Sequence, residues 1–398
     1  MLFEFDYLAE QKAKLKVIGV GGAGGNAINR MIQAGMSGVD FIAVNTDAQD
    51  LENNAATIKI QIGKSLTKGL GAGAKAEIGR EAIEIEKEAV TAMLEEVDMV
   101  FITAGMGGGT GTGAAPVIAQ LARELGILTV GIVTLPFNFE GPKRMNRGIN
   151  GLVELRKACD TTIAIPNQKL MSVVDKSTTV MEAFKTADAT LHQAVKGISD
   201  LINVHGLINL DFADVETIMK NMGEAIMGTG IASGEERAVL AAQQAISSPL
   251  LDSAQISGAQ GVLVNITGGP DLTLIEVDEA TSIIFEEAGQ DANIIFGAVI
   301  DPAMAEEIRV TVIATGFLHP NYVDEGKSVR ENQEQRFKTP GPVYAEQFNV
   351  PLINQKNDIP EAATIIPENK PKFVFDDANP TLFDNDLEIP AFVRQQHK

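Results

Sequence analysis

Two glycine-rich segments have the residue types of anion-binding loops. Gly107–Gly113 has five glycines and two threonines among its seven residues, and Gly19–Gly25 is of similar composition. Each follows an apolar run and precedes a helix-like segment. Glycines let backbone N–H groups approach an anion closely, and a helix N-terminus adds positive potential. We expect both segments at one sheet edge, cradling one polyphosphate, with the Gly107–Gly113 threonines supplying hydroxyls and a contact for a metal ion. Gly69–Lys75 is expected to form a mobile cover.

Other predicted strand ends add specific polar groups. Glu140 offers a carboxylate for ribose hydroxyls, and Arg144 offers a guanidinium for phosphate. Asn167 adds an amide after the next apolar run. These positions suit the sugar and phosphates of a nucleotide.

Phe184 and Asp188 are four residues apart in a helix-like segment, so they share a helix face. The phenyl ring can stack on a base. The carboxylate can accept hydrogen bonds from both N1–H and the exocyclic amine of guanine, a donor pair that adenine lacks. Asp188 therefore favours guanine.

Asp211 and Asp214 form a second candidate site, able to polarise a water molecule or hold a cation. Asp188 and Asp211 are separated by a mostly helical stretch, which predicts a distance on the order of 30 Å. One nucleotide cannot contact both. The aspartate pair is therefore expected to serve the nucleotide of a neighbouring copy in a head-to-tail filament.

Parts of the sequence also resemble two other nucleotide-binding motifs. The spacing of Gly19, Gly21 and Gly24 fits a dinucleotide-binding fingerprint, and Asp47 ends the next predicted strand a few residues late. A P-loop ending at Gly63 fails, because position 58 is Ile58 rather than glycine. The dinucleotide motif leaves Gly107–Gly113 unexplained.

The elements that must position these residues alternate between strand and helix patterns. This alternation predicts a doubly wound α/β fold with a parallel sheet. The expected strands of the first region are 15–20, 40–46, 98–105, 128–136 and 161–166. A long helix is expected over 178–203, from apolar residues that recur every three or four positions.

A second α/β region is expected to form a separate sheet, with strands at 261–269, 273–280, 292–300 and 307–317. The polar, aperiodic stretch that follows predicts a disordered linker that ends in a short apolar, partner-binding peptide. The predicted organisation is an N-terminal extension (1–13), a nucleotide-binding domain (14–177), the helix (178–203), a C-terminal domain (204–317), a linker (318–383) and a peptide (384–398).

Composition limits the classes of function. The net charge of −21 argues against nucleic acid and against a bare anionic membrane as partners. Cys159 is the one cysteine and is expected to be buried and inert, and the four histidines lack metal-ligand spacing. The N-terminus does not read as a signal peptide, and no segment has the length of a membrane span.

The motifs together resemble the tubulin-like GTPases, and specifically the FtsZ family of prokaryotic cell-division proteins. The resemblance covers about residues 14–317, and the tail DLEIPAFVRQQ is similar to the C-terminal peptide of that family. The matching segments are GVGGAGGNA, VNTDAQDL, TKGLGAGA, GGGTGTG, FNFEGPKR, AFKTAD, NLDFADV, SGEERA, NITGGPDL and IRVTVIATGF.

The resemblance implies a GTPase that polymerises head-to-tail into protofilaments, with each active site completed between adjacent subunits. It implies GTP/GDP and Mg²⁺ as ligands, a cytoplasmic ring at mid-cell, and membrane tethers and division regulators bound through residues 384–398. The implied catalytic residues are Asp211, Asp214 and Asn209. The implied nucleotide-binding residues are Gly21, Gly22, Ala23, Gly24, Gly25, Asn26, Gly107, Gly108, Gly109, Thr110, Gly111, Thr112, Gly113, Glu140, Arg144, Asn167, Phe184 and Asp188.

Some positions depart from the family pattern. Ala23 stands where glycine is usual, Lys75-Ala76 where Asn-Pro is common, and Asp188 where many members have asparagine. Residues 302–304 differ from the usual acidic stretch. Two other functions remain at this point: a dinucleotide-dependent oxidoreductase, and a nucleotide-gated scaffold without catalysis.

Overall fold

The computed structural model describes residues 13–317, except for Val173, Lys176, His205, Asn209 and residues 252–255. The predicted N-terminal extension up to residue 12, the linker and the C-terminal peptide lie outside the described residues.

A single ten-stranded sheet runs through the described part of the chain, in the order β3-β2-β1-β4-β5-β6-β7-β10-β8-β9. Its strands are β1 (Leu15–Val20), β2 (Asp40–Asn45), β3 (Ile58–Gln61), β4 (Met99–Gly105), β5 (Leu128–Leu135), β6 (Thr161–Pro166), β7 (Gly223–Ser233), β8 (Gly261–Gly268), β9 (Asn293–Ile300) and β10 (Glu307–Thr315). Only β10 runs antiparallel to its neighbours among these described strands. The predicted α/β fold with a parallel sheet is confirmed.

The helices cover both faces of the sheet. They are α1 (Gly21–Gln33), α2 (Ala48–Glu52), α3 (Lys64–Thr67), α4 (Ala76–Ile85), α5 (Lys87–Met93), α6 (Thr110–Glu124), the 3₁₀ turn Asn138–Glu140, α7 (Pro142–Ala158), α8 (Asn167–Leu170), α9 (Val180–Asn203), α10 (Phe212–Met219), α11 (Arg237–Ile246) and α12 (Leu274–Ala288). One core holds α1, α9 and α10 against the sheet, and another holds α4, α5, α6 and α7. A third core lies under α11 and α12.

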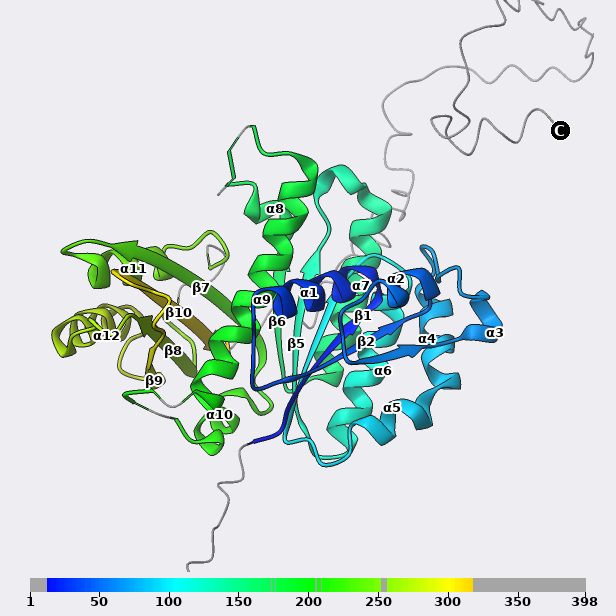
Figure 1. Cartoon of the computed structure of the whole chain (residues 1–398), viewed down its shortest axis with the longest axis horizontal. Coiled ribbons are helices and arrows are strands. Elements are labelled where there is room, and N and C mark those ends of the chain that lie inside the picture. The colour runs from blue at the N-terminus through cyan, green and yellow to red at the C-terminus, as the bar shows by residue number, and fades with distance from the viewer. Residues whose placement is uncertain are drawn as a thin grey trace, which may run out of the picture. The chain divides into compact units, whose positions relative to one another are not determined.

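The long helix α9 packs on one face of the sheet, across the place where the strands of the two regions meet (Figure 1). Its 24 residues correspond to a length of about 36 Å. The helix begins with a capping box, in which the Glu182 N–H donates to Thr179 Oγ1 at 3.2 Å and the Thr179 N–H donates to Glu182 Oε2 at 2.7 Å. These bonds satisfy donors that a helix start leaves free, so the local sequence fixes where α9 begins.

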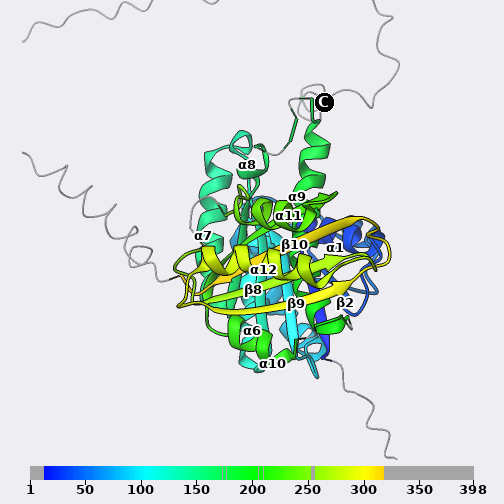
Figure 2. The ribbon, with the colours of Figure 1, turned by 90° about the vertical axis from the view of Figure 1, so that its left-hand side faces the viewer.

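The expectation of two separate sheets is wrong. Strand β7 pairs in parallel with β6, with Thr161 opposite Gly223 and Ile163 opposite Ala225. This pairing joins the strands of the second region to the first sheet. Viewed from the side of the second region, α11 and α12 lie over β8, β9 and β10 (Figure 2).

The predicted strand at 273–280 is also wrong, because these residues begin α12. Glu276 donates its N–H to Thr273 Oγ1 at 3.3 Å, and its carboxylate accepts the Thr273 N–H at 2.8 Å. That capping box favours a helix, and the buried residues Val277, Ala280 and Ile284 recur at helical spacing.

Candidate nucleotide-binding site

Four neighbouring parallel strands end at the same edge of the sheet. Strand β4 pairs with β1 and β5, and β5 pairs with β6, all in parallel. Both glycine segments, the turn at Glu140 and the start of α8 at Asn167 follow directly after these strands. In open α/β sheets this carboxyl edge is where ligands bind.

The two glycine segments lie directly against each other. A Cβ atom on Gly21 would be 3.0 Å from the backbone nitrogen of Gly111, and one on Gly111 would be 3.1 Å from the Val20 carbonyl oxygen. Side chains at these positions would separate the two loops. Glycine therefore allows the starts of α1 and α6 to approach one point.

The N-termini of α1 and α6 have the positive electrostatic potential that an anion site requires. Helix α1 has 13 residues and α6 has 15, and neither has an acidic residue in its first turn. Their unpaired N-terminal N–H groups create positive potential at the sheet edge. Around Gly108, no described atom lies within 4 Å of the place that a Cβ would take, so this part of the loop is open.

The predicted cover segment, Gly69–Lys75, lies beside the second glycine loop. A Cβ on Gly109 would be 2.7 Å from the Gly73 carbonyl oxygen and 2.9 Å from the Ala72 Cβ. The Ala48 N–H also donates to the Gly69 carbonyl at 3.1 Å, which ties the segment to α2. The segment therefore borders the open loop at Gly108.

Glu140 and Arg144 bind each other. Arg144 Nη1 lies 3.0 Å from Glu140 Oε2, and Glu140 Oε1 accepts the Phe137 N–H at 2.8 Å. The Glu140 side chain is almost fully buried, whereas half of the Arg144 side chain is exposed. Glu140 thus also holds the turn and orients Arg144.

Asn167 has a free acceptor at the same edge. Its side chain is 4% exposed. Within the described part of the chain, its Oδ1 has no hydrogen-bond partner. A buried acceptor without a donor is costly, so this oxygen is suited to a ligand hydroxyl.

Phe184 belongs to an aromatic cluster on the start of α9. Its ring centroid lies 5.4 Å from that of Phe137 and 6.4 Å from that of Phe139, in edge-to-face contacts. Phe184 remains 40% exposed. One turn further on, burial raises the pKa of Asp188 to about 6, and the nearby Arg30 on α1 opposes that rise.

The aspartate pair begins helix α10, which reaches the opposite edge of the sheet at its last residue. Asp211 caps α10, where its N–H donates to Asp214 Oδ2 at 3.3 Å. Helix α10 ends at Met219, whose carbonyl accepts the hydroxyl of Thr161, the first residue of β6. Asn167 follows the last residue of β6, so Asn167 and the end of α10 lie at opposite ends of this strand. Figure 1 shows α10 at the end of α9 that is remote from α8. Asn209 lies outside the described residues.

Comparison with known proteins identifies the family. The GTPase-domain model of the tubulin/FtsZ family matches residues 14–175, and the C-terminal-domain model of the FtsZ family matches residues 223–318. An empty FtsZ dimer from M. jannaschii is 46% identical, with a TM-score of 0.75, over 78% of this chain and 90% of that one. The chain belongs to the FtsZ family.

Other solved structures agree with this FtsZ fold. A point mutant of M. jannaschii FtsZ matches with the same identity and TM-score over 93% of its chain. The GTPγS-bound protofilament of CetZ2 from Haloferax volcanii is 23% identical, with a TM-score of 0.68, over 81% of this chain and 99% of that one. At that identity the likeness concerns the fold alone. This FtsZ-family chain is a GTPase, as its tubulin/FtsZ GTPase domain establishes.

Three residues of this FtsZ-family site were not predicted. Thr46 hydrogen-bonds Thr110 within the buried first turn of α6, at 2.6 Å between the Oγ1 atoms. Arg30 faces Asp188, and Arg147 donates from Nε to the Gly107 carbonyl at 3.2 Å. Arg30 follows Asn26 by one helical turn, which is a usable signal. The role of Arg147 depends on a backbone carbonyl, for which the sequence has no signal.

The remaining sequence expectations concern metal, membrane and thiol. Among the described residues, no group of three or more His, Cys, Asp or Glu side chains is placed to hold a metal ion. No helix in the described ranges is both long and apolar enough to cross a membrane. Cys159 is buried, and burial raises the pKa of its thiol to about 12, which disfavours the reactive thiolate.

Proposed function

We propose that this FtsZ-family GTPase polymerises head-to-tail and hydrolyses GTP at the junction between two subunits. One subunit binds the nucleotide at the carboxyl edge of its sheet. The next subunit inserts Asp211 and Asp214, with Asn209, into that site. The observation that carries the proposal is that the glycine segments lie at the carboxyl edge of the parallel strands, whereas α10, which Asp211 caps, ends against the first residue of β6.

The nucleotide contacts are assigned from the geometry of the edge. Residues 21–26 and 107–113 bind the phosphates through backbone N–H groups and the hydroxyl of Thr110, while the Thr112 hydroxyl holds the Gly107 N–H. Arg144 adds a guanidinium on a side chain that is half exposed and paired with Glu140. The free Oδ1 of Asn167 accepts a ribose hydroxyl. Glu140 contacts the ribose through the carboxylate lone pairs that its bonds to Arg144 and to the Phe137 N–H leave free.

Guanine is selected at the start of α9. The base stacks on Phe184, which is 40% exposed and is held by an edge-to-face contact with Phe137. Asp188 accepts hydrogen bonds from N1–H and the exocyclic amine of guanine. Adenine would leave this half-buried carboxylate with one donor in place of two.

Exposed apolar side chains support a subunit contact at this edge. Phe139 is 62% exposed, and Val180 and Met181 at the start of α9 are exposed to a similar degree. Leu207, just before the aspartate pair, is also exposed. These apolar groups lie next to both halves of the proposed site, so a junction that covers them is stabilised by their burial.

Magnesium fits the site as a companion of the nucleotide. Mg²⁺ commonly binds substrate phosphates, a few protein oxygens and several waters rather than an all-protein cage. The Thr110 hydroxyl and the absence of a three-ligand cluster among the described residues suit that mode. When bound, the ion neutralises phosphate charge.

The cellular role follows from the family. We infer that the filaments form the cytoplasmic division ring at mid-cell, and that residues 384–398 bind membrane tethers and division regulators. The FtsZ dimer of M. jannaschii supports self-association of this kind. With a net charge of −21, we do not expect nucleic acid as a partner.

A mixing experiment tests action between subunits. Asp211→Ala should bind GTP but hydrolyse little, and Asp188→Ala should bind GTP weakly. In an equal mixture, about a quarter of head-to-tail junctions pair an intact pocket with an intact aspartate loop, so hydrolysis should partly return. Glu216→Ala, a surface change on the same helix α10, should behave as wild type.

The contradicting result is equally specific. If sedimentation shows that the two variants co-assemble and yet the mixture hydrolyses no more GTP than the variants separately, Asp211 does not act on a neighbour's nucleotide. If Asp211→Ala alone hydrolyses normally, another group positions the water.

A further inference from the structure

The backbone of Gly107 is held from two sides. Its N–H donates to Thr112 Oγ1 of α6 at 2.8 Å, and its carbonyl accepts Arg147 Nε of α7 at 3.2 Å. The first bond is buried and the second is partly buried. The bond to Thr112 thus fixes the Met106–Gly107 peptide, and the bond from Arg147 fixes the Gly107–Gly108 peptide that follows it.

Without these bonds, the loop has considerable conformational freedom. Gly107 has a φ of +100°, a region that glycine adopts readily, and Gly108 has open space around its Cα. With glycine on both sides, the peptide plane between them can rotate at little steric cost. The bond from Arg147 to the carbonyl selects one orientation of that plane.

The selected orientation determines where the next donor points. In a trans peptide, the carbonyl of Gly107 and the N–H of Gly108 point in opposite directions. The carbonyl points to α7, which packs with α6 on one face of the sheet, whereas α1 packs on the other face. The Gly108 N–H therefore points away from α7, toward the side where the first glycine segment lies.

We propose that Arg147 is a positioning residue, which holds the Gly107–Gly108 peptide so that the Gly108 N–H faces the nucleotide phosphates. Arg147 acts through the peptide and does not touch the nucleotide. The inference rests on the proposed nucleotide site. It adds to that site a residue that belongs to neither glycine segment.

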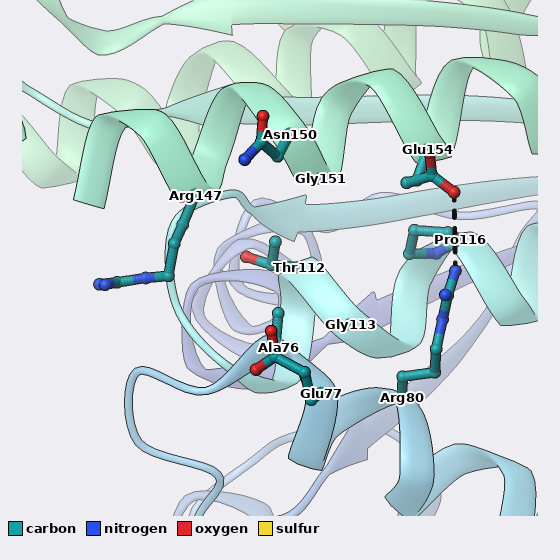
Figure 3. A pocket seen from close by; sticks show the side chains of 10 residues that line it. All are labelled: Ala76, Glu77, Arg80, Thr112, Gly113, Pro116, Arg147, Asn150, Gly151 and Glu154. Carbon is teal, nitrogen blue, oxygen red and sulfur yellow. Dashed lines mark ion pairs between the residues drawn. The ribbon is translucent and has the colours of Figure 1, made fainter. Parts of the chain in front are cut away.

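The surroundings of Arg147 allow its side chain to be substituted without disturbing the core. Arg147 is half-buried at one end of a pocket of about 200 Å³ between α4, α6 and α7. In Figure 3, Thr112 and Gly113 of α6 face Asn150 and Gly151 of α7, and Arg80 pairs with Glu154 at the other end. Because the pocket is open, a change at Arg147 should not disturb the core.

Two substitutions separate the hydrogen bond from the charge. In Arg147→Gln, the amide nitrogen stands at the same position along the side chain as Arg147 Nε, so a neutral donor to Gly107 remains. In Arg147→Met, the side chain is as long as that of glutamine but has no hydrogen-bond donor. The matched controls are Arg80→Gln and Arg80→Met at the other end of the pocket.

The readouts are the dissociation constants of GTP and guanosine, kcat at saturating GTP, and the urea midpoint. We expect Arg147→Met to weaken GTP binding by about tenfold, as for loss of one hydrogen bond to a charged group. Arg147→Gln should stay within about twofold of wild type, since it keeps that hydrogen bond. Guanosine affinity and the urea midpoint should not change in any variant, and the Arg80 variants should bind GTP normally.

Two results would overturn the inference. Wild-type GTP affinity in Arg147→Met would show that the peptide needs no anchor, and equal weakening in Arg147→Gln and Arg147→Met would show that charge alone matters. Failure of the nucleotide site itself is distinguishable through Gly108→Ala, which leaves Arg147 intact. If that change also leaves GTP binding intact, the phosphates bind elsewhere.

Discussion

The Oγ1 atoms of Thr46 and Thr110 lie 2.6 Å apart in a buried hydrogen bond. Thr46 follows β2, and Thr110 begins α6 after β4, so this bond fixes the start of α6 against the end of a strand that is separated from β4 by β1. The first turn of α6 is thereby held in place before any ligand binds. Preorganised donors of this kind need little rearrangement when they meet an anion.

Thr46→Val should loosen this arrangement. Valine keeps the shape of threonine but leaves the Thr110 hydroxyl buried without its partner. We expect a loss of about 1–3 kcal/mol in the free energy of unfolding. Urea denaturation would measure it. The double change Thr46→Val with Thr110→Val should lose less stability than the sum of the two single changes. Strict additivity would mean that the two hydroxyls are not coupled.

The contact between the two glycine segments gives a second prediction. Gly21 has a φ of +73°, and its Cβ would press on the Gly111 nitrogen. Gly21→Ala should therefore destabilise the fold by about 1–2 kcal/mol, the typical strain of a left-handed residue.

Gly108→Ala is the matched change, because its methyl group enters open space. We expect the free energy of unfolding to stay within about 0.5 kcal/mol of wild type. GTP binding should nevertheless weaken, since the methyl occupies the space beside the proposed phosphates. Equal urea midpoints for Gly21→Ala and Gly108→Ala would contradict the close contact of the two loops.

The raised pKa of Asp188 predicts that GTP affinity depends on pH. In the free protein the carboxyl titrates with a pKa of about 6, because burial disfavours its charged form. Binding to the two donors of guanine requires the carboxylate. The GTP affinity should have its full value well above pH 6. It should fall as the pH drops through 6, by up to about tenfold per pH unit.

Asp188→Asn isolates this effect. The amide oxygen still accepts a hydrogen bond but does not titrate, so the dissociation constant should show a flatter profile between pH 5 and 7.5. Since burial of the charge also costs folding energy above pH 6, the variant should be more stable at pH 7.5. If both proteins show the same pH profile, Asp188 does not bind the base as a carboxylate.

Much of the fold could be predicted because its signals are local. Strands such as Leu15–Val20 and Thr161–Pro166 are short apolar runs, and each is followed by a glycine, proline or polar residue that marks its end. The start of α9 carries its own capping box at Thr179. Such elements depend on neighbours within a few residues.

Strand β7 and the bond made by Arg147 could not be predicted, because they depend on partners far along the chain. β7 was not predicted, since its glycines weaken the strand pattern, and its pairing with β6 joins Thr161 to Gly223. Likewise, the bond of Arg147 to a carbonyl 40 residues away requires the folded arrangement of α6 and α7. The error at 273–280 is local instead: its apolar residues suggest a strand, but the capping box at Thr273 begins a helix.

The most direct test of the central claim is the GTPase rate per subunit, measured over a range of protein concentrations. If the site is completed by the next subunit, the rate per subunit should be close to zero at low concentration. It should rise steeply above a threshold, at which sedimentation detects filaments. A rate per subunit that is the same at all concentrations, including those without filaments, would contradict a catalytic site shared between two subunits.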